Sequence, residues 1–218
     1  SPFEQKNLEI IGDIYRDFIQ HNPVDGVLYH DDVTLSDYED SSALAHKYYQ
    51  QWGFSHRIFK DLRHPKQARL AKYKTAYLDQ LAAGITQVLK QYQPNVLVAR
   101  NMYAPVVTQP QSEQWFAQSM PSTYRYYDYN AIMAMPYMEQ SKDHKKFYLD
   151  LIQHAKKYDP NLDRTIFELQ TVNWRNQQKI STQELQHTIQ LLEQHGVKHI
   201  GYYPDDFVAQ HPQVKPMQ

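Results

Sequence analysis

The sequence predicts an α/β protein built on a parallel sheet. Three observations support this prediction: apolar runs of strand length alternate with stretches of helical periodicity, proline or glycine separates many of these segments, and polar residues follow the apolar runs. This alternation is typical of parallel strands joined by helices through right-handed crossovers. The pattern alone leaves a barrel and an open doubly wound sheet as alternatives.

The elements are expected in a regular order along the chain. The expected strands are apolar runs at residues 24–30, 95–100, 130–135, 165–170 and 197–202. The expected helices are one that begins at Ser1 and ends before Asn22, and others at residues 42–52, 66–92, 142–157 and 181–196. Capping patterns open the first and last helices. The first helix is expected to have an apolar face of Phe3, Leu8, Ile11, Ile14, Tyr15 and Phe18.

The composition fits one globular domain over residues 1–218 and excludes several partners. Of the 218 residues 41% are hydrophobic, which is enough for a core, and the formal net charge is −1. A chain so close to neutral has little attraction to nucleic acid or an anionic membrane. Without cysteine there is no disulfide, thiolate nucleophile or zinc–cysteine site. The 18 Tyr and 3 Trp suit either sugar stacking or a tyrosine-rich core.

The segment that ends in Asp31 and Asp32 is the sharpest chemical signal. Parallel α/β folds place their sites at the carboxyl ends of the strands, and both acids follow an expected strand. Side-chain alternation would put Leu28, His30 and Asp32 on one face and Asp31 on the other. On the lumen face, Asp32 is expected to be a general acid with a raised pKa, supported by Asp31. The alternative is that both aspartates only cap a turn.

No metal, cofactor or nucleophilic triad is expected. His30, Asp31 and Asp32 are metal-ligand types, but adjacent strand residues point in opposite directions. The chain also lacks a Gly-x-Ser-x-Gly elbow and a glycine-rich phosphate loop.

Other candidates for sugar contact follow the expected strands or lie at their ends. Aromatic rings can stack on a sugar there, although each ring can equally belong to the core. Arg100 or Asn101 can bind sugar hydroxyls or hold a carboxylate ionised. The candidate set for substrate binding is His30, Arg100, Asn101, Trp115, Tyr137, Gln170, Trp174, Tyr202, Tyr203 and Asp205.

Six separated motifs resemble one known family. They are Asp25-Gly-Val-Leu-Tyr-His-Asp-Asp32, Leu35-Ser-Asp-Tyr-Glu-Asp40, Ala99-Arg-Asn-Met-Tyr-Ala104, Trp115-Phe-Ala-Gln118, Ala131-Ile-Met-Ala-Met-Pro-Tyr137 and Gly201-Tyr-Tyr-Pro-Asp-Asp-Phe207. Together they resemble the C-terminal glycoside hydrolase domain of the PgaB-like periplasmic poly-β-1,6-N-acetylglucosamine deacetylases of Gram-negative biofilm export systems. The resemblance covers nearly the whole chain.

The resemblance implies a (β/α) barrel of TIM type, of which this chain would cover roughly the second half to two thirds. It also implies binding and cleavage of the partially deacetylated exopolysaccharide, with the acid in the Asp31-Asp32 segment. Trp174, Tyr202 and Tyr203 would line the glycan groove, and Asp205 would suit ammonium groups. The family's outer-membrane export porin would be a partner, and the full-length lipoprotein would be periplasmic and associated with the outer membrane. The family's deacetylase domain is absent from this chain.

Two functions remain in competition. The first is an endo-acting hydrolase in which Asp32, or else Asp31, is the acid and a second carboxylate or the substrate's N-acetyl group attacks the anomeric carbon. The second is a binding and export module that does not cut the polymer. Since five strands cannot close an ordinary barrel, we expect either a fragment lacking the first barrel strands or pairing of two copies through the edge strand.

Overall fold

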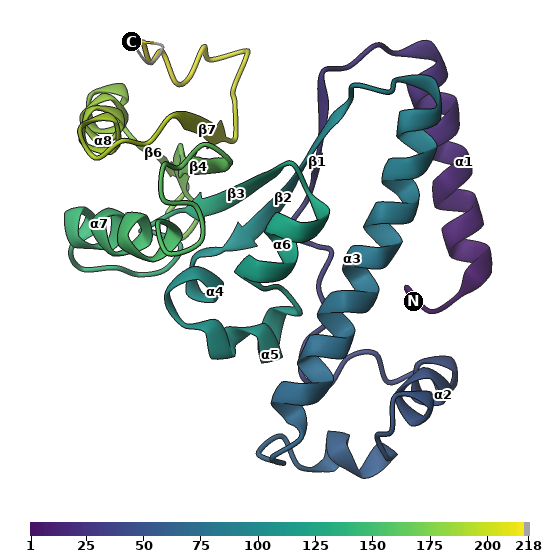
Figure 1. Cartoon of the computed structure of the whole chain (residues 1–218). Coiled ribbons are helices and arrows are strands. Elements are labelled where there is room, and N and C mark those ends of the chain that lie inside the picture. Colours follow the sequence, from purple (N-terminus) through teal and green to yellow (C-terminus); the bar gives the residue numbers. More distant parts are fainter. Residues whose placement is uncertain (216–218) are drawn as a thin grey trace. The chain divides into compact units, whose positions relative to one another are not determined.

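The structure is a computed structural model that describes residues 1–215, apart from the side chains of His56 and Lys60. Its main sheet has five strands in the order β1-β2-β3-β4-β7 (Figure 1). The pairs β1/β2, β3/β4 and β4/β7 are parallel, which confirms the predicted parallel α/β architecture. The strands are β1 (Gly26–Tyr29), β2 (Leu97–Tyr103), β3 (Tyr129–Ala134), β4 (Thr165–Gln170) and β7 (His199–Tyr203).

All five predicted helices are present, with shifts of a few residues at their ends. They are α1 (Gln5–His21), α2 (Ala43–Gln51), α3 (Gln67–Tyr92), α7 (His144–Ala155) and α8 (Thr182–Gln194). Short elements that the sequence did not predict are η1 (His56–Lys60), α4 (Ala104–Thr108), η2 (Pro110–Ser112), α5 (Glu113–Phe116), α6 (Met120–Tyr126) and the antiparallel pair β5 (Val172–Asn173) and β6 (Gln178–Lys179). Among the helices described, none is long and apolar enough to cross a membrane.

The chain divides into two compact units. The first comprises residues 1–100 and 109–128, and the second comprises residues 101–108 and the described chain from Tyr129 onward. The boundary passes through β2, so its first four residues belong to the first unit and its last three to the second. Each unit therefore carries its own part of the parallel sheet.

In the first unit, the long helix α3 packs against α1 and β1 (Figure 1). Ile19 of α1 is buried with Leu89 and Val96, and the two helices lie side by side. The apolar face predicted for α1 is only partly correct, because Ile14 is 62% exposed and Phe18 is 43% exposed. The buried face is instead centred on Ile19, with Tyr15 packed beside the cluster.

The helix α1 begins three residues later than predicted, with its cap at Glu4 instead of Ser1, and Phe3 lies in an aromatic cluster. The hydroxyl of Ser1 accepts a bond from the amide of Phe3, whereas the helix cap is Glu4 without a side-chain bond. The Phe3 ring stacks on Tyr77 with a centroid distance of 4.6 Å. Each such ring pair contributes about 0.5–1.5 kcal/mol in addition to the burial of its apolar surface. Several of these pairs together outweigh the stabilisation that a capping bond from Ser1 would give the helix. Other members of the cluster are Tyr48, Tyr49 and Trp52.

In the second unit, β4 is the central strand between β3 and β7. The register pairs Glu168 of β4 with Met133 of β3 and with Gly201 of β7. The helix α8 opens as predicted, since the hydroxyl of Ser181 accepts a bond from the amide of Glu184 at 3.1 Å. Gly196 follows the helix with φ +86°, a conformation that favours glycine, so the predicted stop is confirmed.

Lys74 of α3 is a buried cation in the first unit. Its side chain is 1% exposed, and Nζ donates to the carbonyl of Ser36 at 2.7 Å. The ammonium also lies over the rings of Tyr49 and Phe59 at 5.6 and 5.3 Å. Burial lowers the pKa of Lys74 to about 8, although the nearby carboxylates of Asp37, Glu39 and Asp40 act to raise it.

Because Lys74 is buried, we predict that its contribution to the free energy of unfolding rises between pH 8 and pH 9.5. The folded pKa of about 8 lies below the ordinary value of 10.5, so the unfolded chain binds more protons in this window. Relative to Lys74→Met, the free energy of unfolding of the unmodified protein should increase by about 1.5 kcal/mol, measured by urea denaturation. Buried tyrosines with raised pKa values, such as Tyr49 and Tyr127, act in the opposite direction above about pH 9 in both proteins. Lys74→Met should remove the increase, whereas Lys72→Met, an exposed position of the same helix, should keep it. The same pH profile for the unmodified protein and Lys74→Met would contradict the prediction.

Candidate active site

The two candidate acids lie on a turn directly after β1. The strand ends at Tyr29, whose buried hydroxyl contacts the carbonyl of Ala82 and the hydroxyl of Thr86 on α3. The chain then turns, and the amide of Val33 donates to the carbonyl of His30 at 3.3 Å. We call residues His30, Asp31, Asp32 and Val33 the acidic turn. It follows the carboxyl end of its strand, where the sequence placed it.

The two carboxylates of the acidic turn converge on one imidazole. Nδ1 of His30 lies 2.6 Å from Oδ1 of Asp31 and 3.4 Å from Oδ2 of Asp32. The prediction that Asp31 and Asp32 point to opposite faces was therefore wrong. It relied on the alternation of side chains along a strand, and the strand ends before His30. The side chain of Asp31 is 14% exposed and that of Asp32 is 88% exposed. Asp31 is thus held against His30, while Asp32 reaches solvent and is open to a ligand.

The geometric argument against a metal at this turn is also wrong. His30, Asp31 and Asp32 each offer one ligand atom, and these atoms lie within 4.8 Å of one another. An imidazole with two carboxylates is a donor set that a divalent transition metal accepts. Exposed acids commonly have this spacing without a metal, so the absence of a metal stays a prediction.

Arg100 lies beneath the acidic turn and is 1% exposed. Its guanidinium donates to the carbonyl of His30 at 3.2 Å and to the carbonyl of Val33. Because the register pairs Arg100 with the buried Tyr29, its side chain leaves the sheet on the same face as that ring. We therefore expect Arg100 to support the acidic turn and not to contact sugar.

A further carboxylate, Glu168, lies in the second unit and was not among the predicted site residues. It is half-buried on β4, and Nδ2 of the buried Asn101 donates to its Oε2. The signal was present in the sequence, since a glutamate interrupts the apolar strand at residues 165–170. Asn101, which the sequence proposed as a partner for a carboxylate or for sugar, thus has a carboxylate partner.

The face of the sheet that carries Glu168 has open space and an aromatic ring. Its neighbour in the register is Gly201, where an added Cβ would meet only the Ile166 side chain at 3.9 Å. Tyr203 leaves β7 on this same face, and Tyr202 leaves on the opposite one. Trp174 lies in the turn between β5 and β6, and the centroid of its ring is 6.3 Å from the ring centroid of Tyr203. Glu168, Tyr203 and Trp174 are thus the grouping in this unit best suited to a sugar.

Gln170 and Tyr137 have internal partners in the second unit. Gln170 is 2% exposed, accepts a bond from the amide of Met138 and donates to the carbonyl of Val172. It therefore ties together the loop after β3 and the β5–β6 pair. The hydroxyl of Tyr137 donates to Oε1 of Glu184 at 2.7 Å, and burial followed by this bond raises the pKa of Tyr137 to about 12.

The remaining candidate residues belong neither to the acidic turn nor to the group of Glu168, Tyr203 and Trp174. Trp115 is 50% exposed on α5, in a short helix where the sequence predicted a loop. Asp205 is exposed after β7, and the next residue, Asp206, forms an ion pair with Lys179 at 2.8 Å. Glu139 is half-buried after β3, and burial raises the pKa of its carboxyl.

The sequence and the structure both match known proteins. A family model described as hypothetical glycosyl hydrolase family 13 matches residues 1–203. The poly-beta-1,6-N-acetyl-D-glucosamine N-deacetylases of Escherichia coli K12 and O157:H7 are each 39% identical over 221 residues, which cover 98% of this chain and 33% of each relative. The chain therefore spans about a third of these curated relatives.

A solved structure matches the same region. The glycoside hydrolase domain of PgaB (BpsB) from Bordetella bronchiseptica is similar with a TM-score of 0.90 and 39% identity, and the match covers 97% of this chain and 61% of that one. This likeness confirms the predicted barrel-type (β/α) fold, of which the chain carries a part. Because the family model spans most of its length, the chain belongs to the family described as hypothetical glycosyl hydrolase family 13.

Proposed function

We propose that the chain is an endo-acting glycoside hydrolase that binds and cleaves partially deacetylated poly-β-1,6-N-acetylglucosamine. The observation that carries this proposal is the acidic turn, which presents two carboxylates on one histidine at the carboxyl end of a parallel strand. Glycosidases commonly act through carboxylic acids that protonate the leaving oxygen. The names of the relatives, an N-deacetylase of this polymer and a glycoside hydrolase domain, support both the reaction and the substrate.

In this proposal Asp32 is the general acid and Asp31 supports it. Asp32 is the more accessible carboxylate, while Asp31 is held by Nδ1 of His30 at 2.6 Å. A proton donor must reach the glycosidic oxygen, and only the accessible group can do so without rearrangement of the turn. His30 would keep the two carboxylates in place.

Glu168 is the proposed sugar-binding carboxylate of the second unit. Its bond from Asn101 fixes one carboxyl oxygen, and the glycine beside it leaves space for a ring. The two neighbouring aromatic residues, Tyr203 and Trp174, would stack on sugars bound there. The nucleophile that acts with Asp32 is either a second carboxylate or the substrate's own N-acetyl oxygen.

The second candidate function is a glycan-binding module that holds the polymer during export without cutting it. The exposed Asp205 and Asp32 favour it, because carboxylates attract the ammonium groups of deacetylated glucosamine. We also propose, from the resemblance to the export family, that the protein acts in the periplasm beside an outer-membrane porin. We further propose that deacetylation, the activity named for the Escherichia coli relatives, is performed by a domain outside this chain.

Mass spectrometry of the products separates hydrolysis from binding. Partially deacetylated polymer should be shortened by the unmodified protein, and Asp32→Asn should lower kcat by about 10²–10⁴-fold because an amide cannot donate the proton. Asp31→Asn should impair cleavage less, and glycan affinity should change little in either variant. The control is Asp17→Asn, which is comparably exposed on α1. Polymer of unchanged length with the unmodified protein would favour the binding module, and a reversed ranking would make Asp31 the acid.

Replacing Glu168 tests its role in sugar binding. Glu168→Gln keeps an oxygen for the bond from Asn101 but removes the charge, so binding of partially deacetylated oligosaccharides should weaken by about 1.5–3 kcal/mol while the melting temperature stays close to that of the unmodified protein. Glu193→Gln, half-buried on α8, is the matched control. Unchanged affinity of Glu168→Gln would exclude Glu168 from the sugar contacts.

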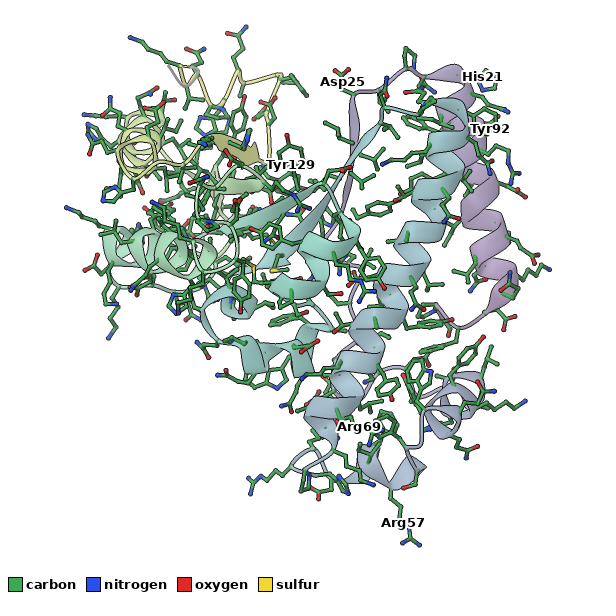
Figure 2. The ribbon with its side chains drawn as sticks, viewed as in Figure 1. His21, Asp25, Arg57, Arg69, Tyr92 and Tyr129 are labelled. Atoms are coloured by element: carbon green, nitrogen blue, oxygen red, sulfur yellow. The ribbon has the colours of Figure 1, made fainter. Side chains whose placement is uncertain are left out.

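Trp174 should contribute to affinity and not to stability. Trp174→Ala should weaken binding of oligosaccharides by about 1–3 kcal/mol, the range known for bases stacked on aromatic side chains. Calorimetric titration would measure this loss. Tyr92→Ala, at the end of α3 and 41% exposed, is the aromatic control (Figure 2). A large drop in melting temperature with unchanged affinity would show that Trp174 belongs to the core.

A further inference from the structure

The acidic turn begins after the last residue of β1, so it lies outside the strand. The bond that closes the turn, from the amide of Val33 to the carbonyl of His30, is long at 3.3 Å, and the next bond joins the amide of Thr34 to the carbonyl of Asp32 at 2.8 Å. The Asp32 side chain is 88% exposed, so its position depends on the backbone of the turn more than on packing.

The side chain of Arg100 binds both ends of this turn. One nitrogen of its guanidinium donates to the carbonyl of His30 at 3.2 Å, and the other donates to the carbonyl of Val33. These carbonyls belong to the first and last residues of the acidic turn. A guanidinium is a rigid planar fork, so two simultaneous bonds fix the separation and the direction of both ends.

The charge of Arg100 is compensated within the same unit. Asp79 of α3 is 3% exposed, accepts a bond from the hydroxyl of Tyr127 at 2.9 Å and another from the hydroxyl of Ser122. Burial raises the pKa of Asp79, while these two bonds and the charge of Arg100 act to lower it. A buried cation without such a partner would be strongly destabilising. The fold thus provides a place for a guanidinium directly under the turn.

We propose that Arg100 is a positioning residue for the acid pair, because its guanidinium clamps the two ends of the turn that carries Asp31 and Asp32. The proposal rests on the function proposed above. Arg100 is buried and does not touch substrate, so its effect on catalysis passes through the backbone of the acidic turn. Its loss should therefore lower kcat more than it raises KM, since glycan contacts made elsewhere remain.

The decisive variant is Arg100→Lys in the natural full-length protein. It keeps a cation near Asp79 but loses the fork, so the protein should fold while the turn loosens. A misplacement of about 1 Å at a reacting group can cost about 10²-fold in rate, so kcat should fall by about that factor with KM nearly unchanged. Amide exchange at Val33 and Thr34, followed by mass spectrometry, should become faster than in the unmodified protein.

A rescue experiment and a matched control exclude a purely structural effect. In Arg100→Ala, millimolar ethylguanidine should restore part of kcat, whereas ethylamine at the same concentration should not, because the planar guanidinium presents separated donors to the two carbonyls and the ammonium is a compact point charge. Leu89→Ala removes another fully buried side chain of the first unit, within the cluster of Ile19 and Val96. It should lower stability without changing kcat per folded molecule or exchange in the turn.

The outcomes separate this proposal from the proposed function. Arg100→Lys with the kcat and the turn exchange of the unmodified protein would overturn the positioning role. An unmodified protein that leaves the polymer uncut would overturn the hydrolase instead. In that case the proposal that Arg100 fixes the turn is still supported if amide exchange at Val33 and Thr34 accelerates in Arg100→Lys. Unchanged exchange would overturn it.

Discussion

Parallel pairing is the constraint on which the candidate site depends. In each unit the paired strands run in the same direction, so their carboxyl ends lie at one edge of that unit's sheet. The acidic turn follows β1 in the first unit, and the loops bearing Tyr137, Trp174 and Asp205 follow strands of the second. Within each unit, the candidate residues therefore gather on the loops that follow the strands.

Apolar periodicity was sufficient to predict the five strands and five helices, since burial of those side chains drives both. It failed where a tertiary contact competes with a local preference. Ser1 has the residue type of a helix cap, but burial of Phe3 among aromatic rings pulls the chain away from the helical path. The short helices between residues 104 and 126 have too few turns to show a period.

The candidate site was also only partly predictable from the sequence. That acids follow β1 could be predicted, because they interrupt an apolar run. Their orientation could not, since alternation applies only while the strand lasts and β1 ends at Tyr29. The role of Arg100 was equally hidden, because a sequence does not reveal which carbonyls a guanidinium will reach. Aromatic residues were also divided by tertiary structure: Phe3 and Tyr49 belong to the core, whereas Tyr203 is 49% exposed.

Gly201 shows how a site can be in tension with the stability of its own scaffold. Its φ does not lie in the region reserved for glycine, and a methyl group would meet only an ordinary contact with Ile166. The backbone of β7 therefore does not need glycine at this position. Glycine inside a strand costs roughly 0.5–1 kcal/mol relative to alanine, because the unfolded chain gains conformational freedom. With glycine at this position, β7 is less stable than it would be with alanine. The space beside Glu168 stays open as a result.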